Sequence, residues 1–143
     1  MKWIDLPPIW LLAFAVLTWF SQSVVTLALP KWLGTVLVCV GLALMLAAIW
    51  EMQRKRTTVI PHMQPRVLVD TGIFAYSRNP IYLGDALILA GLALRWDAPI
   101  GLLLVPVFMW VIHTRFITAE EARLRTAFGP AFDAYAAITR RWV

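Results

Sequence analysis

The sequence has little charge and almost no cysteine. Charged residues make up 15% of its 143 residues, where soluble domains have about 25%. Cys39 is the single cysteine, which excludes a disulfide framework and a cysteine-based zinc cluster within one chain. The two histidines are His62 and His113. His62 has no other histidine or cysteine near it in the sequence, so we expect no metal site.

Apolar residues take the place of the missing charge. They make up 61% of the chain, where soluble domains have about 45–50%, and the mean hydropathy is +0.73. This content excludes a disordered chain. A globule of this length has too little interior to bury so much apolar surface. The composition therefore predicts an all-α integral membrane protein whose apolar side chains are covered by lipid.

Four apolar stretches are predicted to cross the membrane as helices. They are residues 9–29, 32–50, 79–95 and 98–114. The first two are long enough to span about 30 Å of hydrocarbon, while the last two need tilt or local thinning of the bilayer. Short turns around Lys31 and Asp97 would join them into two antiparallel hairpins. A cleaved signal peptide is the alternative for the first stretch, but its apolar run exceeds the usual length of about 7–15 residues.

Basic residues predict the orientation in the membrane. Of the thirteen Lys and Arg residues, Lys31 and Arg95 lie in the two short turns. The other eleven are Lys2 and the basic residues of loop 51–78 and tail 115–143. By the positive-inside rule, we expect both termini and the loop to be cytoplasmic in a multi-pass protein of a bacterial inner membrane. The net charge of +5 then indicates contact with anionic membrane lipids rather than with nucleic acid. The tail is expected to be an amphipathic helical segment.

Two motifs flank the second predicted hairpin. The first contains Gly72 and Phe74 and continues as Arg78-Asn79-Pro80-Ile81-Tyr82-Leu83-Gly84; the second contains Glu120-Glu121, Phe128-Gly129 and Tyr135. Together they resemble the isoprenylcysteine carboxyl methyltransferase superfamily, which includes the phospholipid N-methyltransferases. Its pattern is Arg-His/Asn-Pro-x-Tyr-x-Gly, a helical hairpin, then Glu-Glu-x-x-Leu-x-x-x-Phe-Gly. The resemblance covers residues 54–143, more than half of the chain. We expect the whole chain, residues 1–143, to form a single membrane-embedded methyltransferase domain.

The resemblance implies a membrane enzyme that binds S-adenosylmethionine from the cytosol and methylates a lipophilic acceptor. The acceptor group stays open between an isoprenylcysteine-type carboxylate, a phospholipid amine and a small lipophilic molecule. The implied cofactor contacts are Arg66, Val67, Leu68, Val69, Phe74, Arg78, Asn79, Pro80, Ile81, Tyr82 and Glu120. The chain departs from the eukaryotic prenylcysteine enzymes, which have histidine at Arg66 and Asn79. Their substrate-carboxylate arginine aligns with Phe116, next to Arg115.

The chemistry of S-adenosylmethionine suits these residue types. Its ammonium needs an anion such as Glu120, its carboxylate needs donors such as Arg78 or Arg66, and its adenine needs a wall such as Phe74 or Tyr82. Aligning the reactants and excluding water would be the main catalytic contribution of the protein. Candidate catalytic residues near the acceptor are Arg115, Asp85 and His113.

Several of these residues also have a structural interpretation. Thr118 and Glu121 have capping-box spacing, which predicts a helix that begins near Thr118 and leaves Glu120 for the cofactor. Asp85 could be a paired or snorkelling carboxylate, and His113 a hydrogen-bonded packing residue.

The functional alternative is a non-catalytic four-helix membrane protein, or a degenerate relative with a scaffolding role. In that case Arg78-Asn79-Pro80 would anchor the chain to lipid headgroups, with the proline in the first turn of a helix. A transporter is a third possibility, but it would show paired, broken helices in repeated halves.

Overall fold

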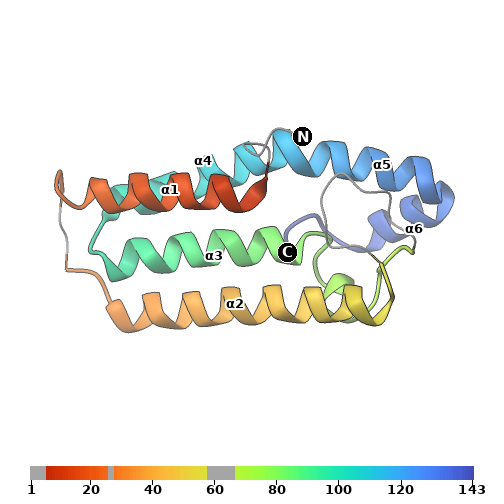
Figure 1. Cartoon of the computed structure of the whole chain (residues 1–143), viewed down its shortest axis with the longest axis horizontal. Coiled ribbons are helices and arrows are strands. Elements are labelled where there is room, and N and C mark those ends of the chain that lie inside the picture. Colours follow the sequence, from red (N-terminus) through yellow and green to blue (C-terminus); the bar gives the residue numbers. More distant parts are fainter. Residues whose placement is uncertain (1–5, 26–27, 58–66) are drawn as a thin grey trace.

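The computed structural model describes residues 6–25, 28–57 and 67–143, and the regular structure in these ranges is entirely helical. In chain order the elements are α1 (Pro7–Ser21), α2 (Lys31–Arg54), the 3-10 helix η1 (Gly72–Ala75), α3 (Pro80–Arg95), α4 (Pro99–Ile112), the π-helix η2 (His113–Ile117), α5 (Thr118–Phe128) and α6 (Pro130–Ile138). Figure 1 shows α1 to α4 side by side, with α5 and α6 beyond one end of the bundle. The prediction of an all-helical chain is confirmed.

The helix boundaries follow local sequence signals. Four helices have a proline in their first turn, where the missing backbone N–H would have had no partner within the helix. Helix α1 ends at Ser21, well before the predicted end of the first stretch at residue 29. The Ser21 hydroxyl donates to the Thr18 carbonyl and the Ser23 hydroxyl to the Phe20 carbonyl, both at 2.7 Å. These side chains compete for the carbonyls that would continue the helix.

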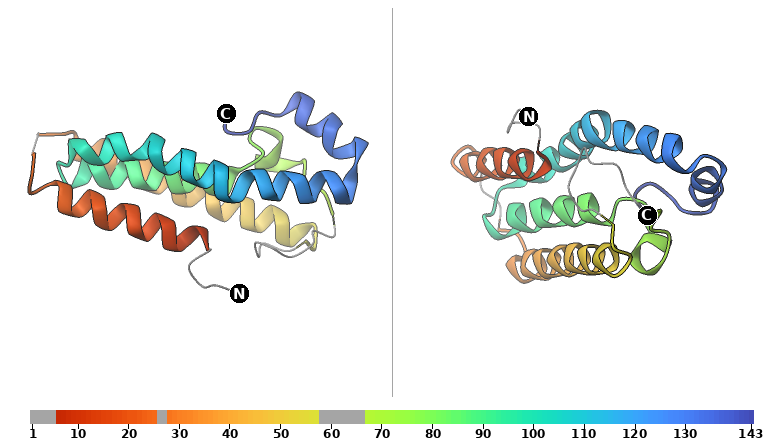
Figure 2. Two further views of the ribbon diagram at one scale, coloured as in Figure 1. Left: turned by 90° about the horizontal axis from the view of Figure 1, so that it is seen from above. Right: turned by 45° about the vertical axis from the view of Figure 1, so that its right-hand side comes forward.

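The four long helices alternate in direction and pack in the order α2, α3, α4, α1 (Figures 1 and 2). The main core lies between α1, α3 and α4, where Phe14, Leu89 and Phe108 are buried. The rings of Phe14 and Phe108 meet edge to face, with centroids 5.4 Å apart. Helix α3 is therefore the central helix, and α1 and α2 lie on opposite sides of it.

Helices α2 and α3 approach closely at two pairs of glycines. A Cβ atom on Gly41 would lie 2.6 Å from the Gly84 carbonyl oxygen, and one on Gly34 would lie 2.6 Å from the Gly91 carbonyl oxygen. The converse holds in both pairs, with 2.7 Å from Gly84 and 2.6 Å from Gly91. Small residues of this kind let helix backbones come into direct contact in membrane proteins.

One end of the bundle is closed by contacts between its two turns. Asp97 accepts a hydrogen bond from the Leu29 N–H at 3.1 Å, and its carboxylate lies 2.8 Å from the Lys31 ammonium. These contacts lower the pKa of the Asp97 carboxyl, the Lys31 hydrogen bond most strongly. The rings of Trp19 and Trp96 meet edge to face at 5.1 Å. The end opposite to this one is open and carries the candidate site.

Helices α4, η2 and α5 form one continuous helical run from Pro99 to Phe128. Thr118 has helical backbone angles, and its hydroxyl donates to the Thr114 carbonyl one turn earlier at 3.0 Å. Helix α5 does begin at Thr118, as predicted. The predicted capping box is wrong, because the residues before Thr118 are already helical and no side chain caps the start of α5. Helix α5 ends at Phe128, and the following Gly129 takes a φ of 49°.

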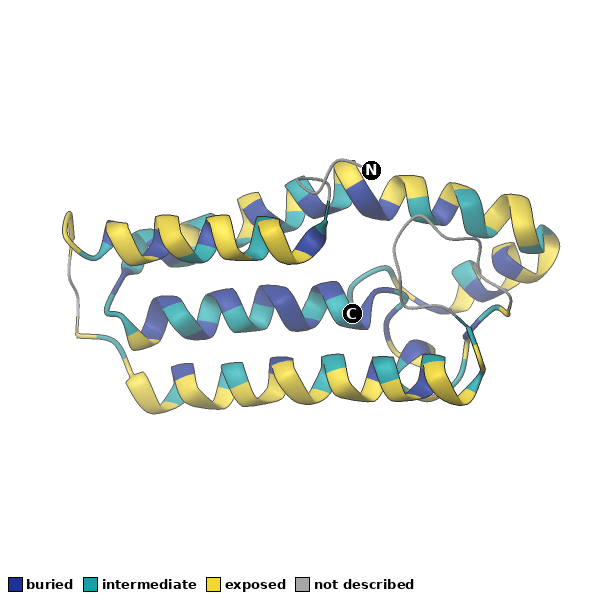
Figure 3. Cartoon of the chain, in the orientation of Figure 1, coloured by how far each residue is buried: buried dark blue, intermediate teal, exposed yellow. Residues whose placement is uncertain are grey.

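The outer faces of the bundle are apolar and exposed (Figure 3). Helix α2 and the run Pro99–Phe128 are long and apolar enough to cross a membrane. In their most apolar 18-residue stretches, only 17% and 28% of the helix is buried. The core helix of a soluble protein is mostly buried. Helices α1 and α3 are shorter, so the crossing of the membrane by four helices stays a prediction. The first two predicted spans do not pack as a hairpin, because α3 lies between α1 and α2.

Candidate active site

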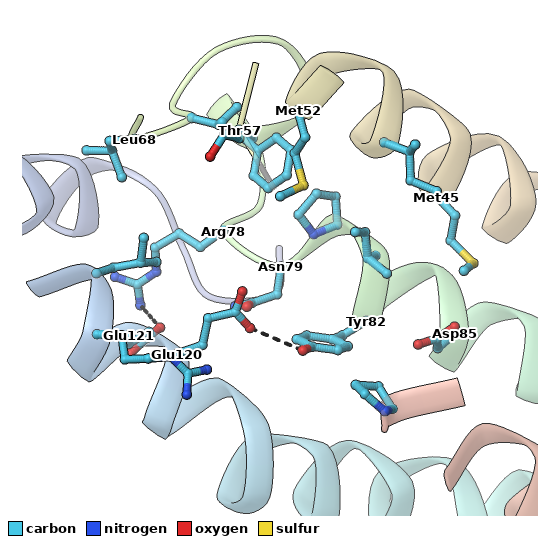
Figure 4. Close-up of a pocket in the computed structure, with 18 of the residues that line it drawn as sticks. Met45, Met52, Thr57, Leu68, Arg78, Asn79, Tyr82, Asp85, Glu120 and Glu121 are labelled. Atoms are coloured by element: carbon cyan, nitrogen blue, oxygen red, sulfur yellow. Dashed lines mark hydrogen bonds and ion pairs between the residues drawn. The ribbon is translucent and has the colours of Figure 1, made fainter. Parts of the chain in front are cut away.

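A cavity of ≈ 400 Å³ lies where α2 ends and α3 begins. This volume is within the range of about 300–1,000 Å³ found for small-molecule sites. Its walls come from the start of α1, the C-terminal half of α2, the 67–75 segment, the start of α3, and helices α5 and α6. Figure 4 shows polar side chains of α3 and α5 facing each other across it.

The first motif forms the turn that leads into α3. The Asn79 N–H donates to the Ser77 hydroxyl at 3.2 Å, and the Asn79 side-chain Nδ2 donates to the Arg141 carbonyl at 2.9 Å. The Arg78 N–H donates to the Arg140 carbonyl at 3.0 Å. The backbone after α6 therefore holds this turn in place. Asn79 lines the cavity, and the nitrogen of its side-chain amide already donates to the backbone of the chain.

Two arginines enclose Glu121 beside this turn. Arg141 donates from Nε and Nη2 to the two carboxylate oxygens, at 2.9 and 2.7 Å, and Arg78 Nη2 lies 3.3 Å from Oε1. Arg78 Nη1 also donates to the Ala136 carbonyl at 3.3 Å. The buried Nε of Arg78 has no hydrogen-bond partner within the described ranges. The Arg78 side chain is thus held by two contacts and keeps one donor, Nε, for a ligand.

Glu120 points in another direction from Glu121. The Tyr82 hydroxyl donates to Glu120 Oε2 at 3.1 Å, and both residues line the cavity. Successive residues of a helix are about 100° apart, so the two glutamates serve different neighbours. This contact brings the second motif on α5 within hydrogen-bond distance of the first motif on α3 (Figure 4).

The 67–75 segment is fastened to the end of α2 by a buried carboxylate. Thr71 Oγ1 donates to Glu51 Oε1 at 2.6 Å, and Arg54 Nη2 lies 2.9 Å from the same oxygen. Gly72 has a φ of 62°, and a Cβ there would lie 3.0 Å from the Glu51 carboxylate. Both the backbone conformation and the space therefore require glycine at this position.

Helix α6 holds the same segment from the opposite side. The Tyr135 hydroxyl donates to the Phe74 carbonyl at 2.7 Å. Phe74 packs with Val69 and Ala48 in a small buried cluster. Together these contacts place the apolar side chains of the segment in the wall of the cavity.

The predicted cofactor contacts in the described ranges all line this cavity. They are Val67, Leu68, Val69, Phe74, Arg78, Asn79, Pro80, Ile81, Tyr82 and Glu120. Arg66 lies outside the described residues. Residues that are more than fifty positions apart in the sequence are thus brought to one cavity.

The predicted catalytic residues do not come together. Asp85 lines the cavity. His113 instead lines a shallower cavity of ≈ 330 Å³, and the Arg115 guanidinium lies 5.0 Å from the centre of the Trp10 ring. In the parts of the chain that the structure describes, no three His, Cys, Asp or Glu side chains are grouped so that they could hold a metal ion.

Sequence reasoning missed the residues that complete the walls. The start of α1 contributes Leu6, Pro7, Pro8 and Leu11, and α2 contributes Met45, Ile49 and Met52. These apolar residues carry no motif that separates them from lipid-facing positions. Glu51 did carry a signal, because it is the only acidic residue in α2. An acid at the end of an otherwise apolar helix indicates a specific partner.

Comparison with known proteins places the chain in a family. The phospholipid methyltransferase family matches residues 29–131. The chain is also 33% identical over 69 residues to the protein-S-isoprenylcysteine O-methyltransferase of Schizosaccharomyces pombe, a match that covers 48% of this chain and 29% of that relative. No solved structure matches the chain. Since the family match covers most of the chain and includes both motifs up to Gly129, this protein belongs to the phospholipid methyltransferase family.

Proposed function

We propose that the protein is an integral membrane methyltransferase that uses S-adenosylmethionine to methylate a lipophilic acceptor. One observation carries the proposal: the two motifs build the polar end of a cavity whose other end is apolar. Arg78, Glu120 and Tyr82 mark the polar end, and Met45 lies toward the apolar end (Figure 4). A charged cofactor and a lipid-soluble acceptor need these two environments next to each other.

The residues present fit the parts of the cofactor. Glu120 offers a carboxylate for an ammonium group, and the buried Nε of Arg78 offers a donor for a carboxylate. Phe74 and Val69 offer an apolar wall for an adenine ring. When bound, S-adenosylmethionine would supply an electrophilic methyl group.

The protein would orient the two reactants and exclude water from them. Three contacts hold the polar wall rigid: Tyr135 of α6 donates to the Phe74 carbonyl, Asn79 donates to the Arg141 carbonyl after α6, and Arg78 pairs with Glu121 of α5. Orientation of two reactants in a fixed cavity is a large part of enzymatic rate enhancement. The apolar walls exclude the water that would compete with the acceptor.

The proposal includes an orientation in the membrane. Trp32 and Trp50, 70% and 62% exposed, lie near the two ends of α2. Eighteen residues of helix span about 27 Å, which is close to the hydrocarbon thickness of about 30 Å. Four helices would cross a bacterial inner membrane, with both termini and the cavity on the cytoplasmic side. The basic residues of the 51–78 loop and the tail support that orientation.

The test is a titration of the protein, purified in mild detergent, with S-adenosylmethionine and S-adenosylhomocysteine by calorimetry. We expect both to bind, and Glu120→Gln to weaken binding roughly ten- to a hundredfold, the effect of losing one charge-assisted hydrogen bond. Asp133→Asn, an exposed acid outside the cavity, is the matched control and should bind as the wild type does.

A second measurement separates an enzyme from a scaffold. Labelled S-adenosylmethionine is incubated with the protein and a total lipid extract, and the lipid fraction is counted. Transfer of label that Glu120→Gln reduces would support the enzyme. Tight binding without transfer to any lipid would favour a degenerate relative, and no binding by folded protein would overturn the proposal.

A further inference from the structure

Asp85 is a buried carboxylate that no described residue binds by a hydrogen bond or an ion pair. It lies on α3 three residues after Tyr82, so it is on the same side of the helix and about one turn deeper in the bundle. Its residue is 3% exposed, and it lines the same cavity as Tyr82 and Glu120. Within the described ranges, neither a hydrogen bond nor an ion pair holds its carboxylate.

The surroundings of Asp85 are apolar. Figure 4 shows Met45 near Asp85, and Asp85 on the side of Tyr82 away from Arg78 and Glu121. Arg78 is already engaged by Glu121, at 3.3 Å. Burying a carboxylate at this depth costs free energy unless a cation or a hydrogen-bond donor binds it. The cavity is where such a group can reach it.

We infer that Asp85 binds the methyl acceptor and that the acceptor is a lipid-soluble amine. The inference rests on the proposed function, because it assigns the second reactant of the same cavity. An ammonium on an apolar chain matches both the charge of Asp85 and the walls around it. A carboxylate acceptor would instead bring two anions together in an apolar environment, which disfavours its binding.

The arrangement also accounts for two separate acids in one cavity. Glu120 and Asp85 lie on opposite sides of Tyr82 (Figure 4), and each suits one cationic group. Asp85 would accept a proton from the acceptor ammonium, which frees the nitrogen lone pair. The nitrogen then bonds to the methyl carbon as the carbon–sulfur bond breaks, and the positive charge passes from sulfur to nitrogen.

The test compares octylamine with octanoate, two probes of equal chain length and opposite charge, at constant detergent and without a methyl donor. Binding is measured from the change in tryptophan fluorescence of the full chain. We expect the wild type to bind octylamine at least tenfold more tightly than octanoate. Asp85→Asn should lose roughly ten- to a hundredfold in octylamine affinity, while Asp133→Asn, which removes the same charge outside the cavity, should lose none.

Two results would overturn the inference. One is a wild type that binds octanoate as tightly as octylamine, which needs no variant to fold. The other is an Asp85→Asn protein that still binds S-adenosylhomocysteine, and is therefore folded, yet binds octylamine as the wild type does. Failure of the wild type to bind S-adenosylhomocysteine would count against the proposed cofactor, while the preference between the two probes would still report on Asp85.

Discussion

At the scale of single residues, two adjacent glutamates contact different neighbours and are therefore expected to have different roles. Glu121 is enclosed by Arg78 and Arg141, while Glu120 lies beside Tyr82 at the cavity. Glu121→Gln would leave a mostly buried arginine without its charge partner, which costs about 1.5–3 kcal/mol of unfolding free energy for a charged hydrogen bond. Glu120→Gln should lower S-adenosylmethionine binding and leave stability nearly unchanged.

The two variants form a matched pair, because each removes one charge from neighbouring positions of one helix. Thermal unfolding monitored by circular dichroism reports stability, and calorimetric titration reports cofactor binding. If both variants lose stability equally, Glu120 is a structural residue. If Glu121→Gln alone abolishes binding at unchanged stability, the roles of the two acids are reversed.

The capping-box spacing suggested the same division for a different reason. Thr118 and Glu121 fit that pattern, but the helix runs through them from Pro99, so Glu121 is held by Arg141 and not by a helix end. Local spacing cannot distinguish the two cases, since the partner lies twenty residues further along the chain. The sequence predicted residues that the structure places around one cavity, and the tertiary fold decides what holds them.

At the scale of helices, the contact between α2 and α3 depends on glycine. Gly41→Ala would place a methyl group 2.6 Å from the Gly84 carbonyl oxygen, so the helices must separate. Overpacking of this kind costs about 1–3 kcal/mol, and it would also shift the α2 wall of the cavity, where Met45 lies one turn away. We expect a lower unfolding temperature together with weaker cofactor binding.

The control for this change is Ala47→Leu on the same helix. Ala47 is exposed, so the larger side chain extends toward lipid and should leave both properties unchanged. Equal unfolding temperatures for Gly41→Ala and the wild type in the same detergent would show that α2 and α3 do not need close contact.

At the scale of the whole molecule, hydropathy predicted the number of long helices and most of their extents. The second and third stretches, 32–50 and 79–95, agree with α2 and α3 within a few residues. Hydropathy does not show which helices touch, so the order α2, α3, α4, α1 and the contribution of α1 to the cavity were not predicted. The motif residues converge because the segment after α6 returns to the start of α3, a long-range contact that no local pattern encodes.

The orientation of the bundle gives the last prediction. The turns around Lys31 and Asp97 lie at one end, and Arg54, Arg78 and Arg141 lie at the other, so labels at the two ends should face opposite sides of the membrane. In a Cys39→Ala background, which removes the single cysteine, Ser23→Cys and Asp133→Cys each introduce one exposed thiol. A membrane-impermeant maleimide applied to intact bacterial cells should label the first variant only, and inverted vesicles should give the reverse, because basic residues are retained on the cytoplasmic side. Labelling of both variants from the same side would mean that an odd number of the helices between the two positions does not cross the membrane.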